Sequence, residues 1–297
     1  MIPLLFLLFA AIPQEPPAPA PTVLGSGAHR YEWVHGWGRL PEGVSYGNTH
    51  GCIVVDAKDR VYVNTDSENA VIVFEPDGTF VRAWGKEFRG GLHGMTLVKE
   101  ASSEVLYLAH TARHEVLKAT LEGEVLWSVA YPEAAGIYKD AGGYAPTSVA
   151  VAPDGGFFVA DGYGASWIHQ YDKDRKYVRS FGGPGKEVGK LQTPHGLWLD
   201  RRGETPTLLV ADRENGRLQR FDLAGRVTIL GRDGKVITHL GDNPDPAKRA
   251  QNGVPRDQWK DGEFISPHCA RWDSKGDLYV LDWLSAGRVS KLKRLGK

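Results

Sequence analysis

The stretch LLVADRENGRLQRF, which spans Leu208 to Phe221, reads as two short strands joined by a charged turn. Apolar residues recur in both runs, and RENG at 213–216 supplies the turn between them. Half-apolar runs bounded by turn residues of this kind predict a β-hairpin. Similar strand–turn–strand units recur along the chain, so this hairpin is one copy of a repeat.

Five copies of the repeat are visible when the chain is aligned with itself, and they begin at Asn48, Gly91, Ala145, Thr193 and Ser266. Each copy reads as three strands separated by a DG-type turn and a polar turn, and most copies add a fourth strand. A period of about 40 to 50 residues with four short strands is typical of a β-propeller blade. The pattern therefore predicts an all-β propeller, in which ring closure leaves few exposed strand edges.

The number of blades follows from the spacing of the copies. An isolated strand–turn–strand unit at Gly225–Asp242 reads as the outer half of a further blade, and the sequence shows no inner strands for it. We therefore expect a six-bladed plan with a truncated fifth blade, and a five-bladed ring is the alternative. The segment Tyr31–Trp37 belongs to no copy, so we expect it to supply the outer strand of the last blade.

The N-terminal segment has a different composition from the rest. Ile2–Ile12 is apolar except for one proline, and a Pro-rich run follows it. An apolar run of about ten residues is too short to span a bilayer but suits a secretory signal. We therefore assign residues 1–26 to a signal peptide and Pro-rich segment, and residues 27–297 to the propeller. We expect a secreted or periplasmic protein with no membrane span after signal removal.

Charge and cysteine content narrow the choice of partners. Lys plus Arg and Asp plus Glu each number 36, so nothing indicates a nucleic-acid partner. Cys52 and Cys269 are the only cysteines, and each closely follows a histidine. We expect two free buried thiols, with a disulfide as the alternative that export would permit.

Histidines stand at the start of the expected inner strand in several copies. His93, His195 and His268 fall in alternate blades of a six-bladed ring, which places them about 120° apart around the central channel. Three converging imidazoles can bind a divalent metal and leave a position open for water or substrate. Zn²⁺ is the first choice, and the ligand type also suits another divalent transition metal. The alternative is that each histidine packs within its own strand.

Other histidines receive different assignments. His50 opens the first copy and breaks the alternation, so we expect it to line the channel and to contact the ligands or the substrate. We expect His110, His114 and His169, which stand elsewhere in the repeat, to be structural or surface residues.

Four segments together resemble the lyase domain of peptidylglycine α-amidating enzymes, a six-bladed propeller of NHL-type repeats. They are VADGYGASWIHQYD (159–172), TPHGLW (193–198), VADRENGRLQRF (210–221) and SPHCARW (266–272). The similarity covers most of residues 45–295. More loosely, the chain is similar to secreted bacterial NHL-repeat propellers.

The resemblance implies a zinc ion held by His93, His195 and His268, a catalytic tyrosine at Tyr163 and an active-site arginine at Arg213. The implied reaction splits a peptidyl α-hydroxyglycine into a peptide amide and glyoxylate. An arginine can grip the substrate carboxylate in a forked pair. A tyrosine needs its pKa of about 10 lowered to act as a base, and we expect Arg213 to lower it. Glu214 and Arg217 are expected to pair with neighbouring turns.

The chain also departs from the family pattern. The family's second arginine has no counterpart, because the turn at 63–70 carries Asp66 and Glu68 instead. Gly164 replaces a cysteine that follows the catalytic tyrosine, and Ser266 replaces a methionine. These changes weaken the case for amidation chemistry more than the case for a metal site.

Three classes of function therefore compete. The first is a metal-dependent lyase that acts on a small carboxylated or peptidyl substrate at the channel mouth. The second is a non-catalytic propeller that binds a protein or glycan partner, for which exposed Trp37, Trp84, Trp167 and Trp283 would serve. The third is a lactonase-like hydrolase, which would need acidic residues at the starts of the inner strands. Histidines stand at those positions here, which disfavours this class. No nucleophile-elbow or P-loop motif is present in the sequence.

Overall fold

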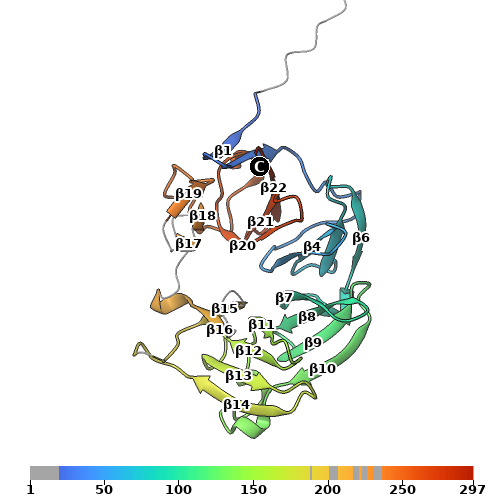
Figure 1. Ribbon diagram of the computed structural model, residues 1–297, viewed down its shortest axis with the longest axis vertical. Coiled ribbons are helices and arrows are strands. Elements are labelled where there is room, and N and C mark those ends of the chain that lie inside the picture. Colours follow the sequence, from blue (N-terminus) through green and yellow to red (C-terminus); the bar gives the residue numbers. More distant parts are fainter. Residues whose placement is uncertain are drawn as a thin grey trace, which may run out of the picture.

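The computed structural model describes residues 20–187, 189–200, 207–216, 221–222, 226–230 and 236–296. Its strands form six antiparallel sheets arranged around a common centre (Figure 1). Within these residues the helical elements are short 3-10 turns: η1 (Lys86–Phe88), η2 (Glu133–Ala135), η3 (Ala141–Gly143), η4 (Arg213–Asn215) and η5 (Arg256–Gln258). The predicted all-β propeller is confirmed, and the six sheets are consistent with a six-bladed plan.

Three sheets are complete four-stranded blades. The first contains β3 (Ile53–Val55), β4 (Val61–Asn64), β5 (Val71–Phe74) and β6 (Phe80–Trp84). The second contains β7 (Leu92–Lys99), β8 (Glu104–His110), β9 (Glu115–Thr120) and β10 (Val125–Ala130). The third contains β11 (Ser148–Val151), β12 (Phe157–Asp161), β13 (Trp167–Tyr171) and β14 (Tyr177–Gly182).

The hydrophobic core lies between neighbouring sheets. The middle strands β4 and β5 are buried along their whole length, because each blade packs against a neighbour on both faces. One cluster joins Tyr62 and Val71 of the first blade to Leu106 of the second. The outer strand β10 instead shows exposed positions. Rows of Val, Ile and Leu in the middle strands suit this two-sided burial.

The fourth and fifth sheets are shorter in the described residues. The fourth contains β15 (Pro194–Asp200) and β16 (Thr207–Asp212), and the fifth contains β17 (Phe221–Asp222), β18 (Arg226–Leu230) and β19 (Val236–Leu240). Pairing of β18 with β19 confirms the predicted unit at 225–242. β17 pairs with β18 and adds a third strand to this unit, so the described sheet has one strand fewer than a complete blade. Arg217 and the second strand of the hairpin at 208–221 lie largely outside the described residues.

The last sheet joins the two ends of the chain. Its order is β1 (Val23–Ser26), β2 (His29–Val34), β22 (Arg288–Arg294), β21 (Leu278–Asp282) and β20 (Pro267–Trp272). Pairing of β2 with β22 confirms that the segment after Tyr31 supplies an outer strand. β1 adds a further strand at the outer edge of this sheet. It lies within residues 1–26, the segment that the sequence assigns to the signal peptide and Pro-rich run. Leu24 packs against the core of this sheet, which gives β1 its place there.

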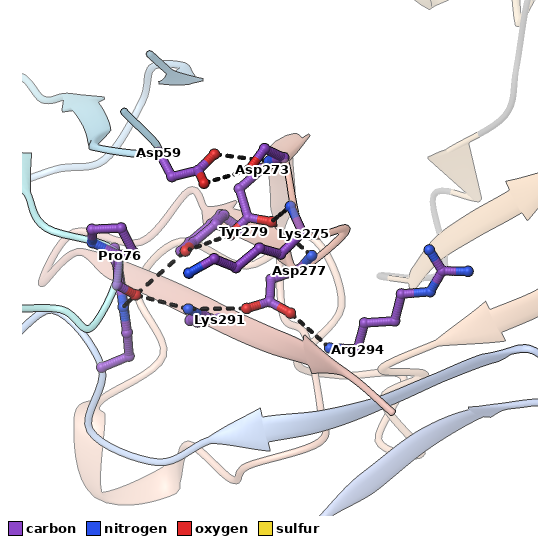
Figure 2. Close-up of polar contacts among 10 residues, drawn as sticks. Asp59, Pro76, Asp273, Lys275, Asp277, Tyr279, Lys291 and Arg294 are labelled. Carbon is purple, nitrogen blue, oxygen red and sulfur yellow. Dashed lines mark hydrogen bonds and ion pairs between the residues drawn. The ribbon is translucent and has the colours of Figure 1, made fainter. Parts of the chain in front are cut away.

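Polar contacts fasten the last sheet to the first, as Figure 2 shows. The Lys291 ammonium donates to the Pro76 carbonyl at 2.7 Å and pairs with Asp277 at 3.1 Å. The backbone N–H of Ser274 donates to the Asp59 carboxylate at 2.8 Å. These contacts lie across the seam at which the ring closes.

The tryptophans that we expected to be exposed are mostly covered. Trp37 is 7% exposed and packs in the core between the first and last sheets, so that expectation was wrong. Trp84 packs against the core between the first and second blades. Trp198 and Trp272, at 57% and 51%, are the strongly exposed ones among the described residues. No helix in the described part of the chain has the length and apolar character to cross a membrane.

Candidate metal centre

Three inner strands each carry a histidine at their second residue. His93 lies in β7, His195 in β15 and His268 in β20. In each strand the pairing register shifts across the histidine, between Leu92 and Gly94, Pro194 and Gly196, and Pro267 and Cys269. Each histidine is therefore the extra residue of a β-bulge. Bulges re-aim a side chain, and they are common beside functional sites.

The three imidazoles converge at one mouth of the channel, as the alternation of blades predicts. Their ring centroids lie 4.8, 5.1 and 5.4 Å apart. His50 joins them, with its ring 4.8 Å from His93 and 5.1 Å from His268. One nitrogen from each of the four histidines lies within 4.8 Å of the others. The arrangement is thus a four-histidine cluster, one residue larger than the predicted set.

Backbone carbonyls orient two of these rings. His93 Nδ1–H donates to the carbonyl of Thr147 at 2.8 Å, and His268 Nδ1–H donates to that of Gly51 at 2.7 Å. A carbonyl only accepts, so Nε2 of each ring carries a lone pair. The Nε2 atom of His268 is buried and has no hydrogen-bond partner among the described residues. Such carbonyl-held imidazoles are typical of metal ligands.

Burial keeps the cluster uncharged. It lowers the pKa of His93 and of His195 well below the usual value, and the neighbouring histidines and Arg213 add to this effect. It lowers the pKa of His268 to about 4, again with help from His50. The pKa of His50 is lowered as well, by burial and then by Arg213. Neutral imidazole is the form that binds metals.

The Tyr163 hydroxyl lies among these nitrogens. Its distance to Nε2 is 2.7 Å for His195, 3.1 Å for His50 and 3.3 Å for His93. One hydroxyl donates one proton, whereas His93 and His268 both contribute lone pairs here. The cluster therefore has more lone pairs than protons, a donor set that fits a divalent transition metal.

The turn that presents Tyr163 is held by Asp161. The Asp161 carboxylate accepts from the backbone N–H groups of Ala165 at 2.6 Å and Ala145 at 2.8 Å. A Cβ on Gly164 would lie 2.1 Å from Asp161 Oδ1. Where the resembling family has a cysteine after the tyrosine, this chain therefore requires glycine, and the Asp161 carboxylate supports the turn.

Arg213 lies beside Tyr163, in the 3-10 turn η4 of the DRENG segment. Its guanidinium carbon is 5.6 Å from the Tyr163 ring centroid. Burial raises the pKa of Tyr163, and Arg213 opposes this rise without cancelling it. Arg213 therefore lowers the pKa of Tyr163, as predicted, but not enough to offset the rise that burial causes. Glu214 was expected to pair with another turn, but it accepts from Arg213 Nε at 3.0 Å within the same turn.

Other residues at this mouth were not assigned to the metal site from the sequence. His50 was given a lesser role, although its His-Gly step matches those at 93–94 and 195–196. Trp283 stacks on His50 at 4.8 Å. Asp66 accepts from Asn48 Nδ2 at 2.6 Å, and its charge acts on Tyr163 to raise that pKa. No local signal indicates the contacts of Trp283 with His50 and of Asp66 with Tyr163, since each joins two different blades.

His110, His114 and His169 have structural contacts away from the cluster. His110 Nε2 lies 3.1 Å from the Phe88 carbonyl, and His169 lies between Tyr138 and Ser180. His114 hydrogen-bonds through Nδ1 to the Tyr144 carbonyl. Each is satisfied away from the cluster.

Together the sheets and the cluster define a β-propeller with a candidate metal centre. No family model matches the chain. Its relatives include peptidyl-α-hydroxyglycine α-amidating lyase 1 of Drosophila melanogaster, with 32% identity over 52% of this chain and 29% of the relative. They also include human NHL repeat-containing protein 3, with 26% identity over 63% of this chain and 55% of the relative.

The relatives are longer proteins, since the chain spans less than a third of the length of the amidating lyase and about half of NHL repeat-containing protein 3. A solved structure with the same fold is the major allergen Mala s 1 of Malassezia sympodialis. The TM-score is 0.50 at 16% identity, over 86% of this chain and 97% of the allergen. This likeness concerns the fold alone.

Proposed function

We propose that this propeller is a metal-dependent lyase that acts on a small carboxylated or peptidyl substrate, and that a peptidyl α-hydroxyglycine is the first substrate to test. The observation that carries the proposal is the Tyr163 hydroxyl, held within hydrogen-bond distance of three histidine nitrogens and beside Arg213. The relatedness to an amidating lyase supports the same reaction class.

His93, His195 and His268 would hold the metal, and His50 would serve as a fourth ligand or contact the substrate. A divalent ion there, Zn²⁺ in first place, would lower the pKa of a bound hydroxyl by acting as a Lewis acid. Because burial raises the pKa of the Tyr163 phenol, a cation among the histidines would also be needed to make a phenolate accessible near neutrality.

The two other side chains then have defined roles. Tyr163 takes the proton from the hydroxyl of the substrate, the carbonyl of glyoxylate forms, and the bond between that carbon and the amide nitrogen breaks. The proton returns from Tyr163 to the nitrogen, which completes the peptide amide. Arg213, whose side chain is partly exposed and lies beside Tyr163, grips the substrate carboxylate.

A direct assay tests this proposal. The zinc-loaded protein is incubated with a peptide that ends in α-hydroxyglycine, and glyoxylate release is measured. We expect Tyr163→Phe to lower kcat by about 100-fold or more, and Arg213→Ala to raise KM. Arg179→Ala is the control, because Arg179 lies on the outer strand β14, where it donates to Gln170. Zinc-loaded protein that releases no glyoxylate above the blank would contradict the proposed substrate.

A second candidate function is ligand binding without catalysis. Trp198 and Trp272 are exposed on inner strands, three and four residues beyond the ligand histidines of those strands, and the Arg271 guanidinium lies 5.7 Å from the Trp198 ring. A cavity of about 540 Å³ opens there, lined by residues 96–99, 149–151, 197–199 and 271. A binding propeller would retain its ligand when His195 is replaced, whereas a lyase would lose activity.

We also propose export, on the basis of the apolar N-terminal segment. Because β1 begins at Val23 and pairs with β2, signal cleavage should fall before Val23 rather than after Ser26. N-terminal sequencing of the protein secreted by a bacterial host tests this site, and cleavage within β1 would contradict it.

A further inference from the structure

The only two cysteines of the chain meet at the seam that closes the ring. Cys52 directly precedes β3 of the first sheet, and Cys269 lies in β20 of the last sheet. The sulfur of Cys269 accepts from the backbone N–H of Ile53, the residue that follows Cys52, at 3.4 Å. Both residues pack in the same core cluster. Two segments from opposite ends of the sequence therefore bring their cysteines close together.

Near these cysteines, noncovalent contacts hold the first sheet to the last. Strands β3 and β20 lie side by side, and His268 Nδ1 donates to the Gly51 carbonyl at 2.7 Å. Thr49 Oγ1 donates to the Asp282 carbonyl at 2.6 Å. A covalent bond between residues 52 and 269 would fasten the strand that carries His268 to the segment that carries His50.

We propose that Cys52 and Cys269 form a disulfide when the folded protein meets a small-molecule disulfide oxidant, and that this bond is a covalent clasp of the propeller ring. The proposal stands apart from the proposed function, because it concerns thiols that the metal site does not use.

The chemistry needs two steps, and the accessibility of the thiols sets their order. Cys52 is half-buried, whereas Cys269 is 7% exposed, so Cys52 attacks the oxidant first. Its thiolate displaces one small thiol and forms a mixed disulfide. The Cys269 sulfur then attacks Cys52 and releases the second small thiol. Two thiol protons are lost, and two electrons reduce the oxidant to two thiols.

The test uses the full chain, stripped of metal with a chelator so that its result does not depend on the proposed function. The protein is incubated with oxidised glutathione, alkylated in denaturant and digested with trypsin. We expect loss of both alkylatable thiols and a linked pair of peptides, residues 40–58 and 261–271. The effective concentration of the two thiols should be on the order of 100-fold higher in native than in guanidinium-denatured protein.

Two further measurements make the test sharper. In Cys269→Ala, the glutathione adduct on Cys52 should persist, since no second thiol resolves it. Oxidation of the wild type should raise its Tm by about 5 °C or more, because the bond closes a very long loop. Two thiols that still alkylate after native incubation, or a lasting glutathione adduct on wild-type Cys52, would overturn the proposal.

Discussion

At the scale of single residues, the site depends on where the backbone departs from regular pairing. His93, His195 and His268 are each the extra residue of a bulge at the start of an inner strand. The third blade, which begins with Thr147 in the equivalent place, has a regular register from Ser148 onward. The Thr147 carbonyl instead accepts a hydrogen bond from the Nδ1–H of His93. The bulged strands thus present ligands, and the unbulged strand orients one of them.

The sequence could predict the identity of these residues but not their geometry. The Pro-His and Leu-His steps and the DGY and DRENG turns are local patterns, so His93, His195, His268, Tyr163 and Arg213 could be singled out. A bulge depends on the register of two strands, and the pKa of Tyr163 depends on residues from several blades. The inclusion of His50 and the raised pKa of Tyr163 therefore required the structure.

Gly164 offers a steric test of the tyrosine turn. Because a Cβ would lie 2.1 Å from Asp161 Oδ1 and the residue has no positive φ, Gly164→Ala should cost about 1–3 kcal/mol through overcrowding alone. Gly253→Ala, where a Cβ meets open space, should change stability by less than about 0.5 kcal/mol. Urea unfolding measures both, and equal effects would contradict the role assigned to Asp161.

His110 gives a pH-dependent prediction. Burial lowers its pKa to about 4 in the folded protein, while the unfolded chain titrates near the ordinary 6.5. Between these values the unfolded state binds more protons, so acidification destabilises the fold. Between pH 6.5 and 4, the free energy of unfolding of the wild type should therefore fall by up to about 1.4 kcal/mol per pH unit more than that of His110→Gln. Parallel pH profiles of the free energy of unfolding would contradict this account.

At the scale of strands and sheets, local sequence patterns were enough to predict most of the strands. Middle strands such as VIVF at 71–74 are continuous apolar runs between turns, which is why the blades could be predicted. The strand VLGS at 23–26 has no such pattern, and its place in the last sheet comes from pairing with β2. Prediction failed where a strand is defined by its partner rather than by its own residues.

The seam between the first and last sheets should be sensitive to Lys291. Lys291 is 9% exposed as a residue, and its ammonium contacts both Pro76 and Asp277. Lys291→Met keeps the apolar stem but leaves Asp277 without this partner, so it should cost about 1–3 kcal/mol. Lys293→Met, on an exposed position of the same strand, is the matched control. Equal stabilities by urea unfolding would show that the contacts in Figure 2 contribute little.

At the scale of the whole molecule, the candidate metal would tie together sheets that are far apart in sequence. His93, His195 and His268 come from the second, fourth and last sheets. An ion that binds only the closed ring stabilises it by about 2.7 kcal/mol at a free concentration of 100 times Kd. Zinc should therefore raise the Tm by about 5 °C or more, and a chelator should reverse the shift. A Tm that is independent of zinc would contradict this coupling between sheets.

The central claim is that the converging histidines bind a metal, and metal content tests it most directly. The purified protein, incubated with zinc and desalted, is analysed by inductively coupled plasma mass spectrometry beside His195→Ala and His35→Ala. His35 is the control because its side chain is 83% exposed and outside the cluster. The account predicts about one metal ion per chain in the wild type and in His35→Ala, and none in His195→Ala. A wild type that takes up no metal, or a His195→Ala variant that keeps it, would contradict the account.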